Sequence, residues 1–468
     1  MKFLRRFHWP LALGGLALTL SVTASAQSGD SVKQSVESRR THYAEMAMQI
    51  WNLAEVGYQE VRSSEILQTE LKAEGFGVES GVAGMPTAFV ASYGEGSPVI
   101  GILAEFDALP GISQEVAAER APIPGLAAGH ACGHHLFGTG SVAAAIAAKE
   151  WLERSGTSGT IRLYGAPAEE GGAGKVYMVR AGLFDGVEAV LAWHPGDANN
   201  ASPATSLANI SAKFRFRGVS AHAAAAPDQG RSALDGVEAM NHMVNLMREH
   251  VPEESRIHYV IASGGSAPNV VPDFAEVYYY CRNPDVEVAK SVFERIVKAA
   301  EGAAMGTGTS VEYERIHGLY SMLPNHYLGK LLDSSLREVG GFSYTPEEKS
   351  FAEQILPTLA RPGTIGSQEQ VREFVPAATN GSTDVADVSW VVPPAHSWQA
   401  VSAGGMSIGT NGMMIAAKTL AAPAVELFSN PSHVMEGLAE LERERGGGFR
   451  YEALVGDRDP PLDYRKNP

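Results

Sequence analysis

Three histidines and a cysteine lie within seven residues of this chain, in the segment Gly129–His135. Cys132 and His134 are two residues apart, so in a loop or at the end of a strand their side chains can point to the same side. A thiolate and an imidazole at this spacing are suitable ligands for a borderline-soft cation such as zinc. The segment by itself is equally compatible with a buried cysteine beside surface histidines.

Other acidic and imidazole side chains follow apolar runs that we predict to be buried strands, at residues 98–104, 160–166 and 188–193. These runs alternate with helical segments, which is typical of a mostly parallel sheet with binding sites beyond the carboxyl ends of its strands. The side chains expected to meet at that edge are Glu105, Asp107, Cys132, His134, Glu169, Glu170 and His194. Each alone has an ordinary explanation, such as a solvated face for the two glutamates, but their common position favours a metal site.

The pattern changes near residue 209. Strands are expected at 211–217, 258–263, 274–282 and 309–316, with helices at 232–249 and 286–302. This β-α-β-β-α-β order is that of a split βαβ, ferredoxin-like domain. We therefore predict an α/β catalytic domain with a mostly parallel sheet, formed by residues 27–208 and 319–468. An α+β lid domain at residues 209–318 interrupts it, and the charged tail from residue 440 is expected to wrap the surface or fray.

Composition narrows the class of protein. The chain has 468 residues and a formal net charge of -16, which argues against a nucleic-acid or anionic-membrane partner. Residues 1–26 have the basic start, short apolar core and small-residue cleavage site of a signal peptide, so we expect a secreted or periplasmic protein without a membrane span after cleavage. Of the two cysteines, Cys281 ends an aromatic run, and we expect it in the core, not in a disulfide with Cys132.

Several motifs carry a resemblance to a known family. They are Glu105–Pro110, His130–His134, Pro167–Gly172, His194–Pro195, Ser220–His222 and His396–Trp398, in this order. With them the chain resembles the zinc amidohydrolases of the aminoacylase and glutamate-carboxypeptidase type over nearly its whole length after residue 26. The resemblance implies a catalytic domain with two adjacent divalent metals, zinc first and manganese or cobalt as alternatives. It also implies an inserted lid through which the chain forms a homodimer.

The resemblance also assigns roles to residues. It implies the metal ligands Cys132, His134, Glu170, His194 and His396, with Asp107 orienting one of them. Glu169 would be the general base, and His222 and Asn269 of the lid would touch the substrate, His222 in the site of the partner subunit. Arg282 would hold the substrate carboxylate. Glu105 stands where many relatives have a histidine ligand or an aspartate, so its role stays open.

The implied reaction is hydrolysis of an amide bond in a small N-acyl, aminobenzoyl or aminoacyl amino acid, with release of the amino acid. An amide carbonyl is a poor electrophile, and two metals can polarise it while lowering the pKa of a water. A carboxylate outside the metal sphere can then move the water's proton to the leaving nitrogen. Adjacent glutamates such as Glu169 and Glu170 can divide these tasks.

Two alternatives stay open, and a departure from the family bears on the first of them. Relatives carry a strand-length segment between the equivalents of residues 390–393 and 394–396, and here the two are fused. A missing buried strand would misplace His396 and weaken one metal position, and the chain would then be a catalytically impaired binder of acyl-amino acids. The other alternative is a thiol hydrolase that uses Cys132 with a histidine.

Overall fold

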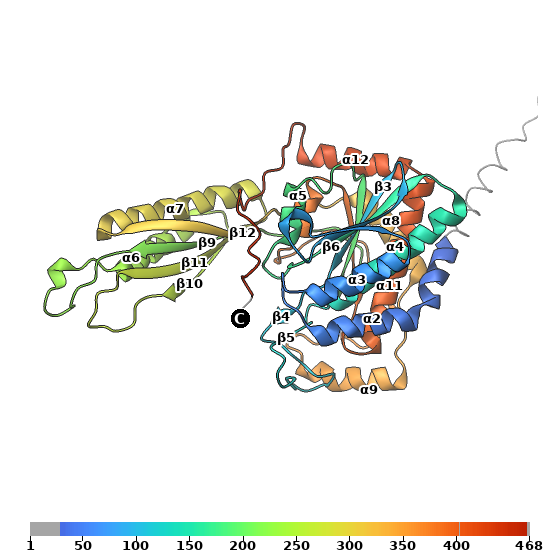
Figure 1. Cartoon of the computed structure of the whole chain (residues 1–468), viewed down its shortest axis with the longest axis horizontal. Coiled ribbons are helices and arrows are strands. Elements are labelled where there is room, and N and C mark those ends of the chain that lie inside the picture. The colour runs from blue at the N-terminus through green and yellow to red at the C-terminus, as the bar shows by residue number, and fades with distance from the viewer. Residues whose placement is uncertain (1–28, 402, 466–468) are drawn as a thin grey trace, which may run out of the picture.

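The central sheet is built from the apolar runs that the sequence predicts as strands. The computed structural model describes residues 29–401 and 403–465. It places β3 (Val99–Glu105), β6 (Gly159–Ala166) and β7 (Ala189–Gly196) in a six-stranded sheet of order β1-β2-β6-β3-β7-β14 (Figure 1). The neighbours β6, β3, β7 and β14 (Pro394–Ala400) are parallel, whereas β1 (Gly77–Ser80) and β2 (Phe89–Glu95) join antiparallel at one edge. The sheet is therefore mostly parallel, as predicted.

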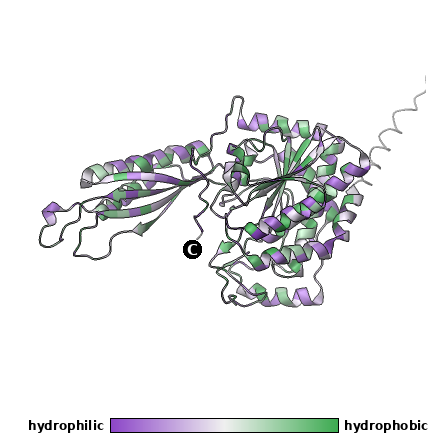
Figure 2. Ribbon diagram, in the orientation of Figure 1, coloured by the Kyte–Doolittle hydropathy of each residue, from purple (hydrophilic) through white to green (hydrophobic). Residues whose placement is uncertain are grey.

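Helices cover the sheet. The alanine-rich α4 (His134–Ser155) lies against β3, β6 and β7 and packs on α11 (Ser407–Ser429), and both helices are buried along most of their length. Figure 2 shows apolar residues along the inner strands and these helices, and polar residues on the outward faces. The other helices of this domain are α2 (Arg40–Leu53), α3 (Val61–Ala73), α5 (Gly174–Arg180), α8 (His326–Val339), α9 (Pro346–Ile355), α10 (Val385–Ser389) and α12 (Ser432–Arg445).

The lid is a four-stranded antiparallel sheet of order β10-β11-β9-β12 that projects from the catalytic domain (Figure 1). Its elements are β9 (Ala208–Arg217), α6 (Ala233–Met247), β10 (Arg256–Ser263), β11 (Phe274–Asn283), α7 (Val286–Thr307) and β12 (Ser310–Leu319). The order along the chain is the predicted β-α-β-β-α-β. Cys281 is fully buried in the lid core and, like Cys132, is a free cysteine.

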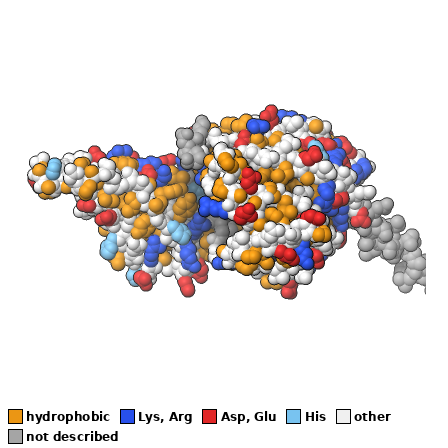
Figure 3. Space-filling model, turned by 90° about the horizontal axis from the view of Figure 1, so that it is seen from below, with side chains coloured by type: hydrophobic (Ala, Val, Ile, Leu, Met, Phe, Trp, Pro, Cys, Tyr) orange, Lys and Arg blue, Asp and Glu red, His pale blue; other side chains and the backbone are white. Residues whose placement is uncertain are grey.

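The edge strand β10 exposes apolar side chains. Tyr259, Val260 and Ile261 are 38%, 59% and 42% exposed, and the neighbouring α6 adds Leu246 at 60%. Apolar side chains are visible on the lid in Figure 3. An edge strand with unpaired backbone groups and apolar side chains is a surface that pairs readily with another chain.

The described residues after α12, 446–465, pack against the rest of the protein and are not a frayed tail. Leu454 and Val455 are each only 4% exposed, because this extended segment runs between the lid and the catalytic domain. The predicted signal peptide, residues 1–26, lies outside the described residues. Among the helices that the structure describes, none combines the length and apolar character needed to cross a bilayer.

Candidate metal centre

Cys132 and His134 are directed by the glycine between them. Gly133 has a left-handed backbone (φ 79°) immediately before α4, and a β-carbon there would lie 2.8 Å from the ring of Pro195. Helix α4 begins at His134, directly after this turn. This turn places His134 at the helix start, facing the carboxyl ends of β3 and β7.

His134 is held between two carboxylates. Its Nδ1 lies 2.9 Å from Oδ1 of Asp107, and the peptide N–H of Glu170 donates to the other oxygen of Asp107 at 2.9 Å. Its Nε2 lies 3.2 Å from Oε2 of Glu105 but makes no well-aligned hydrogen bond with any described residue. Burial alone would lower the pKa of His134, yet Cys132, Asp107 and Glu105 together raise it well above the usual value. This arrangement leaves Nε2 directed at a position where a cation would be favoured.

Glu105 belongs to a buried chain of charges. Its Oε1 lies 2.6 Å from Nζ of Lys175, which lies 2.6 Å from Oδ1 of Asp384. The backbone N–H of Lys175 also donates to Asp384 at 2.9 Å. Burial would raise the pKa of Glu105, but the charges of Lys175 and His134 outweigh burial and lower it. Glu105 is thus a buried carboxylate kept ionised beside the histidine.

Glu169 and Glu170 lie on a strained loop after β6. Ala168 and Ala173 on either side have positive φ angles of 58° and 59°, which costs about 1–3 kcal/mol each for a residue with a β-carbon. Hydrogen bonds from outside the loop hold it: Oε1 of Glu60 accepts from the N–H of Ala168 at 2.8 Å, and the Tyr58 hydroxyl donates to Gly172 at 2.7 Å. The loop is held in one conformation by the surrounding structure.

The two glutamates differ in their surroundings. Burial, followed by the negative charges of Glu105 and Asp384, raises the pKa of Glu169 well above its usual value. Burial also raises the pKa of Glu170, whose carboxylate lies within hydrogen-bonding reach of the Cys132 thiol. One oxygen of Glu170 is buried without a hydrogen bond to any described residue. A cation beside them would compensate the burial of both carboxylates.

His194 presents one nitrogen to this cluster. Its Nδ1 lies 2.7 Å from the carbonyl oxygen of Pro195, so Nδ1 carries the proton and Nε2 is a free acceptor. Nε2 lies 3.5 Å from Sγ of Cys132. Burial, with the charge of His134, lowers the pKa of His194 to about 4, so the ring is neutral. A neutral imidazole with a fixed tautomer is the form that binds a metal.

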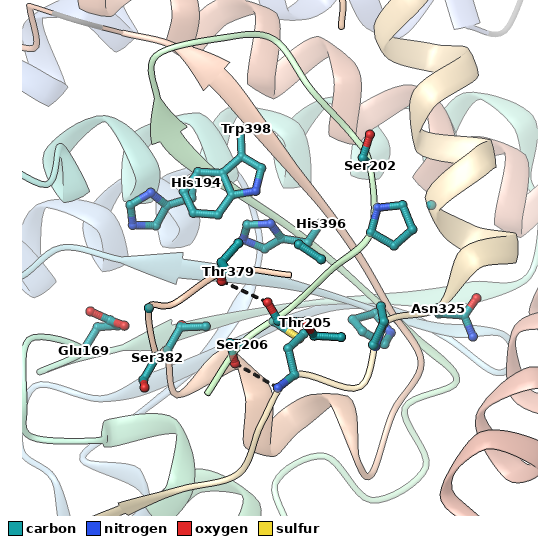
Figure 4. A pocket seen from close by; sticks show the side chains of 18 of the residues that line it. Glu169, His194, Ser202, Thr205, Ser206, Asn325, Thr379, Ser382, His396 and Trp398 are labelled. Atoms are coloured by element: carbon teal, nitrogen blue, oxygen red, sulfur yellow. Dashed lines mark hydrogen bonds between the residues drawn. The ribbon is translucent and has the colours of Figure 1, made fainter. Parts of the chain in front are cut away.

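His396 lines the same cavity but lies at a different level from the other candidate ligands. It is the third residue of β14, and in the parallel register with β7 it pairs with Ala192, while Trp398 pairs with His194. The Trp398 ring accordingly lies 4.9 Å from that of His194 and 5.2 Å from that of His396 (Figure 4). Two residues of a strand correspond to ~6.6 Å, which offsets His396 from His194 along the strands. Residues 390–393 alone join α10 to β14, so the fused segment leaves no further strand between them.

The remaining side chains fit a metal centre. Cys132, His134 and His194 form one group, and Glu105, His134 and Glu169 form another, with ligand atoms within 4.8 Å of one another in each. The orphaned nitrogen of His134 and oxygen of Glu170 are atoms that a cation would satisfy. Cys132, Glu169, Glu170 and His194 line a cavity of about 280 Å³, whose other walls include Ser202, Thr205, Ser206, Asn325, Thr379, Ser382, His396 and Trp398 (Figure 4).

The lid residues that the family resemblance assigns to substrate binding lie in two separate places. His222 is exposed, and its Nδ1 accepts from the N–H groups of Ala224 and Ala225 at 3.2 Å, so Nε2 carries the proton and is a free donor. Asn269 is its neighbour, since its carbonyl accepts from the N–H of Ala223. Neither lines the cavity of its own chain. Arg282 lies at the lid base, where Nη1 is 3.4 Å from the hydroxyl of Ser382 in the cavity wall.

Comparisons with known proteins agree with this picture. The model of the peptidase dimerisation domain of the M20 family matches residues 208–307. One of the subunits of p-aminobenzoyl-glutamate hydrolase from Escherichia coli K12 is 42% identical over 447 residues, which cover 86% of this chain and 93% of that protein. The chain belongs to the M20 peptidase family. This M20 chain is also 28% identical to a mouse Xaa-Arg dipeptidase over 89% of its length and 93% of the relative's.

A solved structure shares the fold of this M20 chain. A dinuclear metal-binding M20 peptidase from Bacillus subtilis superposes with a TM-score of 0.59 at 19% identity, over 84% of this chain and 99% of the other. The family membership and the cluster of candidate ligands make the chain a metal-dependent amidohydrolase or peptidase. The 42% identical hydrolase is the relative that the sequence motifs 381–390 and 231–235 indicate.

The thiol-hydrolase alternative does not fit the M20 site. Burial raises the pKa of Cys132 to about 11 and outweighs the opposing effect of His134, and the other neighbour, His194, is neutral, so the thiol is not activated as a nucleophile. The other two histidines of the motif are buried, not on the surface: Nε2 of His130 lies 3.1 Å from the carbonyl oxygen of Ile50, and Nε2 of His135 lies 3.0 Å from that of Gly404. These two histidines therefore connect the motif to the backbone of α2 and of residue 404.

Sequence reasoning missed part of this M20 site. Lys175 drew no attention because a lysine in a helix is ordinarily solvated, and its burial between Glu105 and Asp384 depends on distant segments. Glu60 and Tyr58, which hold the Glu169–Glu170 loop, lie outside every motif that the sequence analysis identified. For Glu105, the sequence indicated a place in the site only through its position at the end of a predicted strand.

Proposed function

We propose that this M20 chain hydrolyses N-acyl amino acids that carry a free carboxylate, with aminobenzoyl-glutamate-like compounds as the first candidates. The observation that carries the proposal is the convergence of Cys132, His134 and His194, with Glu170 next to Cys132, beside a cavity whose wall includes Ser382, the contact of Arg282. Arg282 is a cation that suits the carboxylate of the substrate. The name of the 42% identical relative supports the same substrate class.

Two divalent cations, zinc first, would bind at this cluster, polarise the amide carbonyl and lower the pKa of a water. Glu169 then accepts the proton of the attacking water and passes it to the leaving nitrogen. Glu170 is the ligand of the pair, because its carboxylate lies within hydrogen-bonding reach of the Cys132 thiol and one of its buried oxygens has no hydrogen bond to any described residue.

We also propose a homodimer that forms through the lid. The exposed apolar edge of β10 supports this assembly, together with the match to a dimerisation domain. In that dimer His222, whose free Nε2–H is a hydrogen-bond donor, completes the partner's site by donating to the developing oxyanion. Export to the periplasm or medium is proposed from residues 1–26 alone, and cell fractionation tests it.

The decisive experiment is metal analysis of the purified protein together with an amine-release assay. The assay uses p-aminobenzoyl-glutamate, N-acetyl amino acids and Xaa-Arg dipeptides in added zinc. We expect turnover that falls ~10²–10⁴-fold in Glu169→Gln with metal content retained, because an amide cannot accept the proton. Glu79→Gln, on an exposed residue of β1, is the matched control. Binding of these compounds without amine release would instead support the impaired binder that the fused segment suggests.

A further inference from the structure

The C-terminal segment Phe449–Arg465 touches both domains before it reaches the Glu169–Glu170 loop. Leu454 packs in the lid core with Tyr320, whereas its neighbour Val455 packs in the core of the catalytic domain. The segment is drawn dark red between the two domains in Figure 1. A chain that places successive residues in two cores ties these domains together.

Arginines anchor the middle of the segment on both sides. On the catalytic side, Nη1 of Arg180 donates to the carbonyl oxygens of Gly456 and Arg458, each at 2.7 Å. On the lid side, Nη1 of Arg458 donates to the carbonyl of Ile316 at 2.6 Å, and its Nη2 pairs with Glu314 at 3.1 Å. Helix α5 and strand β12 are thus joined through the C-terminal segment.

The end of the segment reaches the backbone of Glu170. The carbonyl oxygen of Glu170 accepts from the Tyr464 hydroxyl at 3.1 Å and from Nη2 of Arg465 at 2.9 Å. The Gln59 amide donates to the carbonyl of Leu462 at 2.7 Å and holds this end in place. A β-carbon on Gly57 would collide with the Tyr464 hydroxyl, so Gly57 provides the space for this side chain.

These contacts restrain the peptide bond between Glu170 and Gly171, which the glycine would otherwise leave free to rotate. Gly171 has φ 93°, and glycine permits rotation of the preceding peptide that other residues resist. The N–H of Glu170 is fixed by Asp107, and its carbonyl is fixed by Tyr464 and Arg465. Because the N–H and the carbonyl of Glu170 are both fixed, the direction of its Cα–Cβ bond is set.

We propose that residues 449–465 are a positioning element of the active site, in which Tyr464 and Arg465 keep the Glu170 peptide oriented so that the glutamate pair faces the metal cluster. The contacts with β12 connect this element to the lid, and those with α5 connect it to the catalytic domain. The position of the lid relative to the Glu169–Glu170 loop is therefore fixed. The inference rests on the proposed amide hydrolysis for its kinetic consequences and on the proposed ligand role of Glu170 for its effect on metal binding.

The test is the double variant Tyr464→Phe/Arg465→Met in the full chain, which removes both donors but keeps the aromatic ring. The matched control is Tyr93→Phe/Arg443→Met, which removes a hydroxyl and a guanidinium that donate to Glu153 and Glu444 on the surface. Zinc affinity, kcat, KM, unfolding temperature and oligomeric state are measured for both. We expect kcat to fall ~10–100-fold and zinc affinity to fall about tenfold, with KM and unfolding temperature near those of the control.

A conservative variant separates positioning from general stability. Arg465→Lys with Tyr464 intact keeps two donors near the carbonyl and is expected to retain most of kcat. A kcat equal to that of the control, or a loss that follows only the fraction of folded protein, overturns the proposal. If the parent protein hydrolyses none of the compounds, the proposed function fails separately. Zinc affinity then decides alone, and an unchanged affinity of the double variant overturns the positioning role.

Discussion

Replacement of Lys175 by methionine tests the buried chain of charges behind the metal cluster. Lys175 is fully buried, and its ammonium group lies 2.6 Å from both Glu105 and Asp384. Methionine keeps much of the volume but removes the charge. Two carboxylates would then share a buried site without their common cation.

The expected cost follows from these distances. Two unit charges 2.6 Å apart attract by roughly 6 kcal/mol at an effective dielectric constant of 20, and the desolvation of each ion offsets much of this attraction. Removal of one partner of a buried pair leaves the desolvation cost of the other uncompensated, and typically destabilises by about 3–5 kcal/mol. For a domain of this size we expect the unfolding temperature to fall by about 4–7 °C.

The assay is thermal unfolding at a fixed protein concentration, in excess zinc and again in chelator. Lys349→Met is the matched control, because Lys349 pairs at 4.0 Å with Glu353 on the surface of α9, where both side chains are exposed. A surface pair contributes about 0–1 kcal/mol, so this variant should unfold close to the parent temperature. Lys175→Met/Asp384→Asn should regain part of the lost stability, since one unpaired carboxylate becomes neutral.

Equal unfolding temperatures for Lys175→Met and Lys349→Met would refute this reasoning. They would mean that the buried carboxylates are satisfied without the ammonium group. Failure of the double variant to recover any stability would show that Lys175 acts through packing and not through its charge.

Further predictions concern the pH dependence of stability, the binding of metal and the fused segment before β14. Burial raises the pKa of Asp387 to about 8, so the folded chain binds this proton more tightly than the unfolded chain, and stability should fall as pH rises from about 4 to 8. In Asp387→Asn this part of the pH dependence should vanish in unfolding scans at pH 5 and 8, and an identical slope would contradict the assignment. Chelation should abolish turnover and lower the unfolding temperature, with both restored by zinc, because a bound ligand stabilises the folded state. His194→Ala should lose metal and activity together, and full metal retention would exclude His194 as a ligand. Insertion of a strand-length apolar segment between Pro393 and Pro394 should raise the metal content per chain, whereas two metals per chain before and after insertion would show the fused segment to be harmless.

Much of the fold was predictable because its determinants are local. The runs that became β3, β6 and β7 are apolar over almost every residue, and a continuous apolar run bounded by loops indicates a strand buried on both faces. Parallel strands bring their carboxyl ends to one edge, so the proximity of Glu105, His134, Glu169 and His194 follows from the order of elements. The alternation in β9 and the order of lid elements likewise identify the second domain.

Other features depend on contacts between distant segments and had no local pattern to reveal them. Lys175 and Asp384 are 209 residues apart, and neither neighbourhood indicates that the two charges are buried together. Tyr464 and Arg465 belong to a charged tail whose local sequence resembles a solvated end, yet they reach Glu170 across the molecule.

The chain by itself thus determined which residue types gather at one edge of a parallel sheet, because strand periodicity and helix order are written in neighbouring residues. Only the tertiary structure decided the register that aligns Trp398, and not His396, with His194. It also decided which buried charges neutralise one another and which backbone carbonyl the C-terminal segment holds. Register and pairing depend on the energy of long-range packing, where one residue's position is set by segments hundreds of residues away.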